Sequence, residues 1–224
     1  MFEANGVSKR FGKKAVLQDI SFCLPSGKTM VILGDNGAGK STLLQILATM
    51  LPPDEGSLRY GDLDVLASPR LLRQMMGYVP QELALYEELS VGDNLRFWAD
   101  MSGLSTGEQR ERVLALAQQF GLLGEEKTLV RKLSGGMKRR LNFCVSLFRD
   151  PEVLFLDEPT VHVDAKTGDV VFDALAALKQ AKKTIIYITH LRDEARRLAD
   201  FVLLLEQGNC VYFGEADDFF EENQ

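Results

Sequence analysis

The 224-residue chain contains no long apolar run. Its longest uninterrupted apolar stretches, such as residues 201–205, are far shorter than the roughly 20 residues that a membrane-spanning helix needs. The first five residues include neither a basic region nor an apolar run, which argues against a secretory signal. We therefore expect that the chain has no direct membrane span.

Cysteine is also scarce. Cys23, Cys144 and Cys210 are far apart in the sequence, and no two of them have the spacing of a metal-binding pair. This composition suits the reducing cytosol, and we expect the three cysteines to be small apolar residues of the interior.

Positive charge is in deficit, since 26 lysines and arginines face 32 acidic residues and the net charge is −6. This balance predicts no nucleic-acid partner, because affinity for the phosphate backbone comes from basic side chains. A basic cluster runs against the trend and comprises Lys127, Arg131, Lys132, Lys138, Arg139 and Arg140. Taken alone, the cluster is compatible with a solvated face, with a contact to bound phosphates or with a contact to lipid headgroups.

Hydrophobic residues make up 46% of the chain, which is enough for a sizeable core, and we expect a single domain over residues 1–224. Residues 16–24 mix apolar and polar residues in near alternation, which predicts an antiparallel strand with one wetter face. Residues 27–33 predict a turn that enters a buried strand, and residues 41–50 predict the helix that follows. A small antiparallel subdomain should therefore lead into a parallel core.

The apolar periodicity becomes helical at about residues 90–150. Apolar residues recur there at three- and four-residue steps in residues 91–101, 105–120 and 136–148. The pattern then returns to strand, helix and strand at residues 153–156, 165–181 and 184–189. A terminal hairpin is expected from residues 201–205 and 210–213. This order predicts an α/β fold with a mostly parallel sheet and an inserted α-helical subdomain.

Residues 34–42 have the spacing of a phosphate-binding loop, because Gly34 and Gly39 are followed by Lys40 and Ser41. Small residues let backbone N–H groups converge on phosphate oxygens, and the helix that begins there adds the positive end of its dipole. Lys40 can supply a point charge for the β- and γ-phosphates, while Ser41 can ligate Mg²⁺. The remaining predicted nucleotide contacts in this P-loop are Asn36, Gly37, Ala38 and Thr42.

A second acidic site follows the apolar run at residues 153–156. Asp157 lies where that buried strand should emerge, so its carboxylate can hold Mg²⁺ through water. Glu158 could orient and deprotonate an attacking water, because a general base is needed near the γ-phosphate. An ordinary capping or surface pair of acids is the alternative interpretation.

Residues 133–140, with the sequence Leu-Ser-Gly-Gly-Met-Lys-Arg-Arg, resemble the signature sequence of ATP-binding cassette proteins. Ser134, Gly135 and Gly136 should open a helix with free N–H groups and a hydroxyl, which makes a second anion-binding terminus. The resemblance implies that this terminus closes on the γ-phosphate held by a second copy of the chain. Two composite ATP sites would then form across a twofold axis of a head-to-tail dimer.

Further residues fall in the order of that family, and the resemblance covers nearly the whole chain. Phe11 matches the aromatic residue that stacks on adenine, and Val16 is assigned to the same nucleotide site. Gln81 matches the glutamine that reaches Mg²⁺ and the attacking water. Asp164 matches the aspartate of the loop along the dimer seam, and His190 matches the switch histidine that contacts the γ-phosphate. Taken in isolation, an aromatic or a histidine at these positions would more often be structural.

The chain departs from the family pattern at Met137 and at His162. Met137 replaces the glutamine that commonly follows the two glycines, and with residues 138–140 it resembles the exporter subgroup that moves drugs, lipids or polysaccharides. His162 stands where the family usually has glycine, which tolerates a positive φ more easily. We hypothesise that His162 tunes dimer closure or hydrolysis, and an exposed side chain of no consequence is the alternative. The ATPase activity of His162→Gly at two pH values tests this hypothesis.

The resemblance implies an ATP-binding and ATP-hydrolysing subunit, with ATP and Mg²⁺ as cofactors, that powers transport, expected to be export, through a separate integral-membrane permease. Such a subunit would be cytoplasmic and peripheral at the inner face of the cell membrane, and residues 82–95 should form the surface on which the permease docks. A soluble cassette ATPase that remodels nucleic acid or ribosomes is the alternative, although such proteins generally carry two cassettes or a long coiled coil. A non-catalytic binding module is a second alternative, against which the intact P-loop and acidic pair argue.

Overall fold

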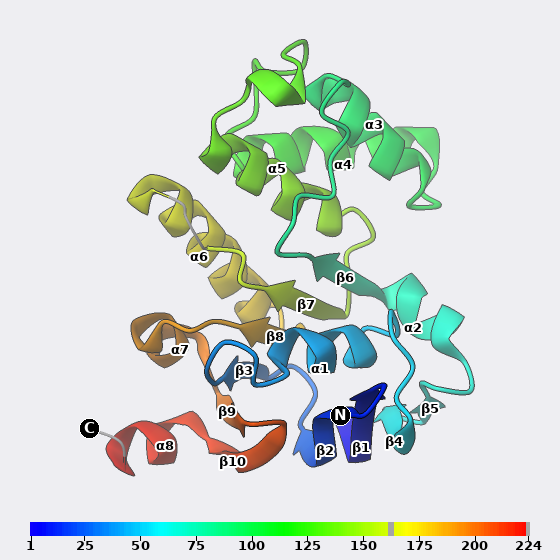
Figure 1. Ribbon diagram of the computed structural model, residues 1–224. Helices are drawn as coiled ribbons and strands as arrows, with labels where there is room; N and C mark the ends of the chain where they lie inside the picture. The colour runs from blue at the N-terminus through cyan, green and yellow to red at the C-terminus, as the bar shows by residue number, and fades with distance from the viewer. Residues whose placement is uncertain (161–163, 223–224) are drawn as a thin grey trace.

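A larger and a smaller β-sheet with helices around them make up the computed structural model, which describes residues 1–160 and 164–222 (Figure 1). The strands are β1 (Phe2–Phe11), β2 (Lys14–Leu24), β3 (Thr29–Leu33), β4 (Glu55–Tyr60), β5 (Leu63–Asp64), β6 (Met76–Val79), β7 (Val153–Asp157), β8 (Thr184–Ile188), β9 (Phe201–Glu206) and β10 (Asn209–Glu215). The helices are α1 (Lys40–Leu47), α2 (Pro69–Met75), α3 (Val91–Asp100), α4 (Thr106–Gln119), α5 (Gly135–Ser146), α6 (Ala165–Gln180), α7 (Arg192–Leu198) and α8 (Ala216–Glu222), and a 3-10 turn, η1, spans Val130–Lys132.

The larger sheet has the strand order β10-β9-β3-β8-β7-β6. Within the described residues, every neighbouring pair in this sheet is parallel except β9 and β10, which form the expected terminal hairpin. All residues of β3, β7 and β8 are buried. Helices cover both faces of a parallel sheet, which explains why these strands are continuous apolar runs rather than alternating ones. The predicted mostly parallel sheet is confirmed.

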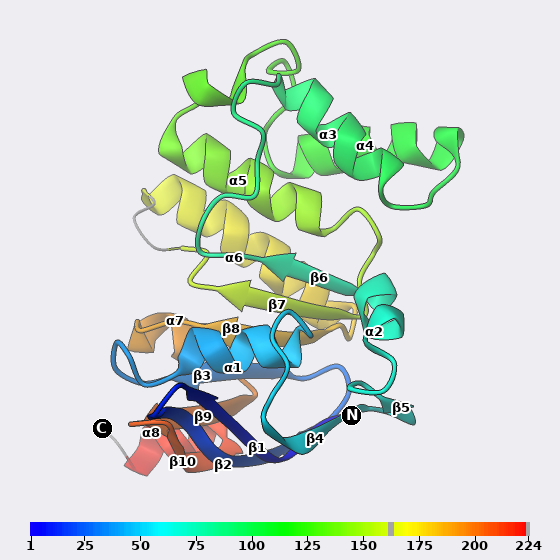
Figure 2. The ribbon, with the colours of Figure 1, turned by 45° about the vertical axis from the view of Figure 1, so that its right-hand side comes forward.

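The smaller sheet is antiparallel, with the order β2-β1-β4-β5, and α1 packs between it and one face of the larger sheet (Figure 2). In β2 the side chains alternate, so that Phe22 and Leu24 are buried whereas Cys23 between them is exposed. The prediction of three interior cysteines is therefore wrong for Cys23, because the two-residue period of the strand places it on the outer face. Cys144 is buried as expected, and Cys210 is half-buried.

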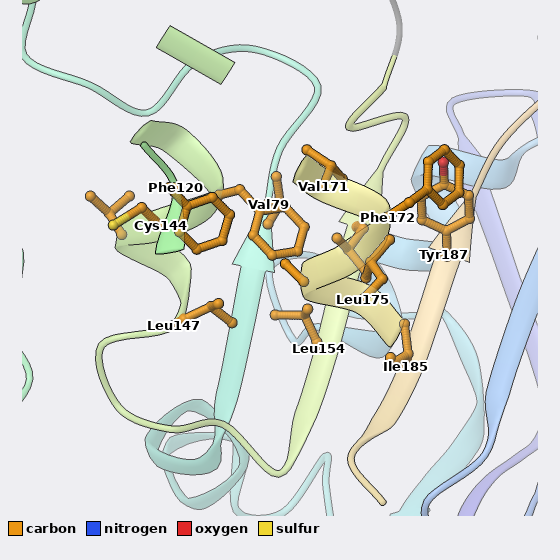
Figure 3. Packing of buried hydrophobic residues seen from close by; sticks show 14 of the residues in the cluster. Val79, Phe120, Cys144, Leu147, Leu154, Val171, Phe172, Leu175, Ile185 and Tyr187 are labelled. Carbon is orange, nitrogen blue, oxygen red and sulfur yellow. The ribbon is translucent and has the colours of Figure 1, made fainter. Parts of the chain in front are cut away.

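The opposite face of the larger sheet packs against α5 and α6, with α3 and α4 farther out (Figures 1 and 2). Figure 3 shows part of this packing, in which Phe120, Leu154 of β7 and Leu175 of α6 belong to one buried cluster. Helices α3, α4 and α5 lie in the chain between β6 and β7, as an inserted helical subdomain requires. The predicted fold class is confirmed by these elements. Among the described residues, no helix combines the length and apolar character that a membrane crossing requires.

The topology brings four strand ends to one edge of the sheet, since β3, β8, β7 and β6 are neighbours and parallel. The chain leaves β3 into the P-loop, β7 into the acidic pair, β6 towards Gln81 and β8 towards His190. Ligands of open α/β sheets bind outside the carboxyl ends of the strands. Residues that are up to 156 positions apart in the sequence, Gly34 and His190, therefore lie around the same site.

Candidate active site

The P-loop connects β3 to α1 in a path that only glycine allows at two points. Gly34 has a φ of 141°, and a Cβ there would lie 2.2 Å from the carbonyl oxygen of Leu205. Gly39, with a φ of 106°, is the N-cap of α1, and a Cβ would lie 2.8 Å from Leu17 Cδ2. Neither position can carry a side chain without a shift of the neighbouring strand, so the loop stays close to the sheet and the first turn of α1 faces the site.

Lys40, the first residue of α1, is only 6% exposed and folds back over the loop. Its Nζ donates to the carbonyl oxygens of Gly34 at 2.7 Å and Asp35 at 2.9 Å. These contacts hold the ammonium group inside the loop opening, where a bound triphosphate would place its β- and γ-phosphates.

Asp157 and Ser41 supply two neighbouring oxygen groups at the end of β7. Ser41 Oγ donates to Asp157 Oδ1 at 3.3 Å, and Asp157 is 4% exposed. Burial raises the pKa of the Asp157 carboxyl, while the hydrogen bond from Ser41 opposes this shift and the charge of Glu158 adds to it. A hydroxyl and a carboxylate are the hard oxygen ligands that Mg²⁺ takes beside nucleotide phosphates, so the two residues fit that ion. A divalent cation would also offset the cost of the buried negative charge.

Glu158 is contacted by two of the other predicted catalytic side chains, Gln81 and His190. Gln81 Nε2 donates to Glu158 Oε2 at 3.1 Å, and His190 Nδ1 lies 3.5 Å from Glu158 Oε1. The φ of Glu158 is +47°, a left-handed value that is rare for a residue with a side chain. Its N–H donates to the carbonyl oxygen of Ile188 at 3.2 Å, which ties the strained residue to β8. The structure therefore brings Gln81, Glu158 and His190 together from three strand ends.

Apart from Asp157, which contacts Ser41 of the lining, these groups line a cavity of about 1300 Å³. The predicted residues among its lining are Val16, Asn36, Gly37, Gly39, Lys40, Ser41, Thr42, Gln81, Glu158 and His190. Ala38 is a predicted contact outside the lining; it is buried, and its N–H donates to the carbonyl oxygen of Asp35 at 3.2 Å. Lys14, Arg192 and Phe219 also line the cavity but were not predicted, because no local motif marks them.

Phe11 ends β1 at the turn into β2 and pairs with Lys14 in the ladder. The residue is 52% exposed, and Lys9 Nζ lies 5.8 Å from the centroid of its ring. Phe11 is not itself in the lining, but it lies at the turn that carries Lys14 into the lining.

The predicted signature residues lie apart from this cavity. Among the described residues, the cavity lining includes none of Ser134, Gly135, Gly136 and Asp164. Ser134 is the N-cap of α5, and its Oγ accepts from the N–H of Met137 at 3.3 Å. Asp164 caps α6 instead, where it accepts from Thr167 N–H at 3.0 Å, and this hydrogen bond lowers its pKa. His162 lies outside the described residues.

Helix α5 also holds the segment that follows Gln81. Arg139 Nη1 donates to the backbone carbonyl oxygen of Gln81, and Asn142 Oδ1 accepts from Ala84 N–H at 2.9 Å. Lys138 Nζ lies 2.5 Å from Glu87 Oε1. Arg131 also pairs with an acid, Glu88, at 3.0 Å, and Arg140 Nη1 donates to the Phe120 carbonyl oxygen at 2.8 Å. Four members of the basic cluster therefore have partners within the described part of the chain.

A parallel sheet whose strand ends carry a P-loop and a buried aspartate defines the P-loop nucleotide-binding class of proteins. Comparison with known families goes further, since the family model described as ABC transporter matches residues 17–161. The chain belongs to the ABC transporter family. This membership confirms the predicted identity of the chain as an ATP-binding ATPase subunit of a transporter.

Curated relatives and solved structures agree with this membership. The linearmycin resistance ATP-binding protein LnrL of Bacillus subtilis is 35% identical over 97% of this chain and 70% of its own length. The Nod factor export ATP-binding protein I of Sinorhizobium fredii is 36% identical over 98% of this chain and 64% of its own length. A dimeric post-hydrolysis structure of an ATP-binding cassette, bound to ADP and Pi, has a TM-score of 0.84 and 25% identity over 96% of this chain and 98% of that chain.

Proposed function

We propose that two copies of this chain bind two ATP molecules between them, head to tail, and that hydrolysis powers export through a separate integral-membrane permease. The observation that carries this proposal is the position of the α5 tip. Ser134 and Gly135 open a helix at a distance from their own cavity, and a Cβ at Gly135 would meet nothing within 4 Å. An open helix N-terminus is an anion site, and the γ-phosphate held by a second copy would occupy it.

Each predicted residue has a role in this scheme. Lys40 and the loop amides of residues 36–42 hold the triphosphate, and Phe11 with Val16 holds the adenine. Ser41, Asp157 and Gln81 would bind Mg²⁺, which screens phosphate charge when it is present. The dimer would place Ser134, Gly135, Gly136 and Asp164 of one copy against the nucleotide of the other.

Hydrolysis needs a proton acceptor beside the γ-phosphate, and Glu158 is placed to be that acceptor. A water held by Gln81 would transfer a proton to a Glu158 carboxylate oxygen as its own oxygen attacks the γ-phosphorus. The bond from that phosphorus to the bridging oxygen breaks at the same time, and ADP leaves. His190 and Lys40 stabilise the charge on the transferring phosphoryl group through hydrogen bonds. Loss of the γ-phosphate removes the ligand shared by the two copies, so the dimer reopens.

The names of two relatives support the direction of transport. One relative is named for Nod factor export and the other for linearmycin resistance, and Met137 with residues 138–140 supports the same direction. We propose that the permease docks on residues 82–95, where Leu83, Tyr86 and Leu89 are exposed. The subunit would then be cytoplasmic and peripheral on the membrane, and residues 1–224 would form a single nucleotide-binding domain with a helical subdomain at about residues 90–150.

The variant Glu158→Gln tests the proposal, because it keeps the size and hydrogen bonding of the side chain but removes the base. We expect ATP binding to persist, hydrolysis to fall by roughly 10²–10⁴-fold and a closed dimer to accumulate with ATP. Size-exclusion chromatography with light scattering measures the dimer, with ADP as the control nucleotide. A Glu158→Gln protein that hydrolyses ATP at the normal rate, or that stays monomeric with ATP and its permease, would contradict the proposal.

A further inference from the structure

Glu194 is a buried carboxylate that the hydrolysis scheme above does not use. It belongs to α7 and is 9% exposed. Its Oε2 accepts hydrogen bonds from the Tyr187 hydroxyl at 2.5 Å and from Thr189 Oγ1 at 2.7 Å. Burial of a carboxylate costs free energy unless hydrogen-bond donors surround it. The two hydrogen bonds to Glu194 therefore also hold both hydroxyl groups in place.

The two donors connect Glu194 to both loops that carry catalytic residues. Tyr187 gives its only hydrogen to Glu194, so at 3.1 Å from Thr160 Oγ1 its oxygen must accept from Thr160. Thr189 Oγ1 accepts in turn from Leu191 N–H at 3.1 Å. The chain of hydrogen bonds therefore begins two residues after Glu158 and ends on both sides of His190.

This network lies where the strand ladder stops. The pairing of β7 with β8 ends at Asp157 and Ile188, followed by the single bond from Glu158 N–H to the Ile188 carbonyl oxygen. Beyond that point the network of Thr160, Tyr187 and Glu194 continues the connection between the two segments. A left-handed φ such as that of Glu158 persists only where the surrounding structure holds it. Thr160 is the member of the network nearest to Glu158 in the sequence, so the network can supply that restraint.

We propose that Tyr187 and Glu194 are positioning residues that hold Glu158 and His190 in register for hydrolysis. Figure 3 shows Tyr187 at the edge of the helix-facing core, beside Phe172, with its hydroxyl oxygen towards the carboxyl ends of the strands. Burial and the neighbouring carboxylate raise the pKa of Tyr187, so its hydroxyl remains a donor at every working pH. The proposal rests on the proposed function, because it takes Glu158 as the base.

The variant Tyr187→Phe tests the proposal, because it keeps the buried ring and deletes only the hydroxyl. The rate constant kcat for ATP hydrolysis by the full chain should fall roughly tenfold to a hundredfold, since displacement of a catalytic group by 1 Å can cost that much. The KM for ATP should change by less than about twofold, because the P-loop is untouched. Tyr60→Phe is the matched control, since its half-buried hydroxyl bonds with Thr184 at the opposite end of β8, and it should keep the wild-type kcat.

A pair of Thr160 variants distinguishes the positioning role of the network from a general loss of folded protein. Thr160→Val removes the hydroxyl at constant shape and should lower kcat like Tyr187→Phe, whereas Thr160→Ser keeps the hydroxyl and should restore most of it. Equal kcat in Tyr187→Phe and Tyr60→Phe, or equal loss in both Thr160 variants, would overturn the positioning role. If Glu158→Gln is inactive in the same assay while Tyr187→Phe is fully active, the positioning role fails and the proposed function stands. If Glu158→Gln is fully active, the proposed function fails as well.

Discussion

Gln81 and Glu158 are joined by a hydrogen bond of 3.1 Å from Gln81 Nε2 to Glu158 Oε2, which links the segment after β6 to the end of β7. The backbone carbonyl of the same glutamine accepts from Arg139 of α5. A single residue therefore connects α5, the helix that Ser134 caps, with the carboxylate proposed as the base. In the proposed dimer, this connection would make hydrolysis in one cavity sensitive to what the α5 tip contacts.

Replacement of Arg139 tests this connection. Arg139→Met keeps much of the side-chain volume but cannot donate to the Gln81 carbonyl oxygen. Without that hydrogen bond, the Gln81 backbone and side chain would be less firmly held beside Glu158. A hydrogen bond from a charged group contributes about 1.5–3 kcal/mol, so we expect ATP hydrolysis to fall by roughly tenfold to a hundredfold. The affinity for ATP, measured with a fluorescent nucleotide, should stay close to that of the wild type.

Arg131→Met is the matched control for Arg139→Met. Arg131 pairs with Glu88 at 3.0 Å, but both side chains are more than half exposed, and such surface pairs contribute about 0–1 kcal/mol. Its hydrolysis rate should therefore equal that of the wild type. Equal rates in the two variants would mean that the contact with Gln81 does not influence the base.

Lys40→Ala should weaken nucleotide binding rather than slow hydrolysis alone. The Lys40 ammonium is held in the loop opening by two carbonyl oxygens, so it meets the phosphates without a large rearrangement. Loss of charged hydrogen bonds of about 1.5–3 kcal/mol predicts a Kd for ATP that is roughly 10–100-fold higher, by isothermal titration. Lys28→Ala removes a half-exposed lysine that lies 3.7 Å from Asp200, and it should leave the Kd unchanged. An unchanged Kd in Lys40→Ala would show that the P-loop is not part of the ATP-binding site.

The sequence predicted elements that carry their own pattern and missed elements that depend on packing. Residues 91–101 and 105–120 have helical periodicity, and α3 and α4 occupy them almost to the residue. Strand β6 has four residues and includes Gly77, where a Cβ would lie 2.6 Å from the Ser146 carbonyl oxygen. That strand pairs with β7 and is closely approached by α5, and no local signal in residues 76–79 reports either contact.

The candidate site divides in the same way. Lys40 and Asp157 were predicted because a motif and a strand end fix their places. Lys40 lines the cavity, and Asp157 contacts Ser41 of the lining. Tyr187 looked like one more residue of a β-branched and aromatic strand, and only the tertiary structure places its hydroxyl beside Glu194. Contacts between segments that are distant in sequence leave no periodic trace, so a single sequence cannot reveal them.

Asp54 should make stability depend on pH. It accepts from Lys9 Nζ at 2.9 Å and from Arg10 N–H at 2.7 Å, and these hydrogen bonds lower its pKa below the ordinary 3.8. A lowered folded-state pKa adds stability above the unfolded value, and this stability is lost as the pH falls through the folded value. Asp54→Asn should therefore lower Tm at pH 7, and the difference from the wild type should shrink as the pH falls below 3.8. A difference that stays constant with pH would show that the charge of Asp54 contributes nothing.

The two glycines of the signature should respond differently to alanine. A Cβ at Gly136 would lie 2.3 Å from Thr167 Oγ1 and 2.8 Å from Asp164 Oδ2, the pair that caps α6, whereas Gly135 has open space. Loss of an N-cap costs about 0.5–2 kcal/mol, so Gly136→Ala should lower Tm by several degrees, at about 2–4 °C per kcal/mol for a chain of this size. Gly135→Ala should keep the wild-type Tm, because alanine is the better helix former.

The same Gly135→Ala protein should nevertheless form less ATP-dependent dimer, because its new methyl group would stand where the γ-phosphate of the other copy has to approach the helix N-terminus. Light scattering with ATP, in the Glu158→Gln background, measures this effect without hydrolysis. This variant separates an effect on dimerisation from an effect on stability, because its added methyl group would have no neighbouring atom within 4 Å in the isolated chain. If Gly135→Ala dimerised and hydrolysed ATP like the wild type, the α5 tip could not be the surface that approaches the nucleotide of the second copy.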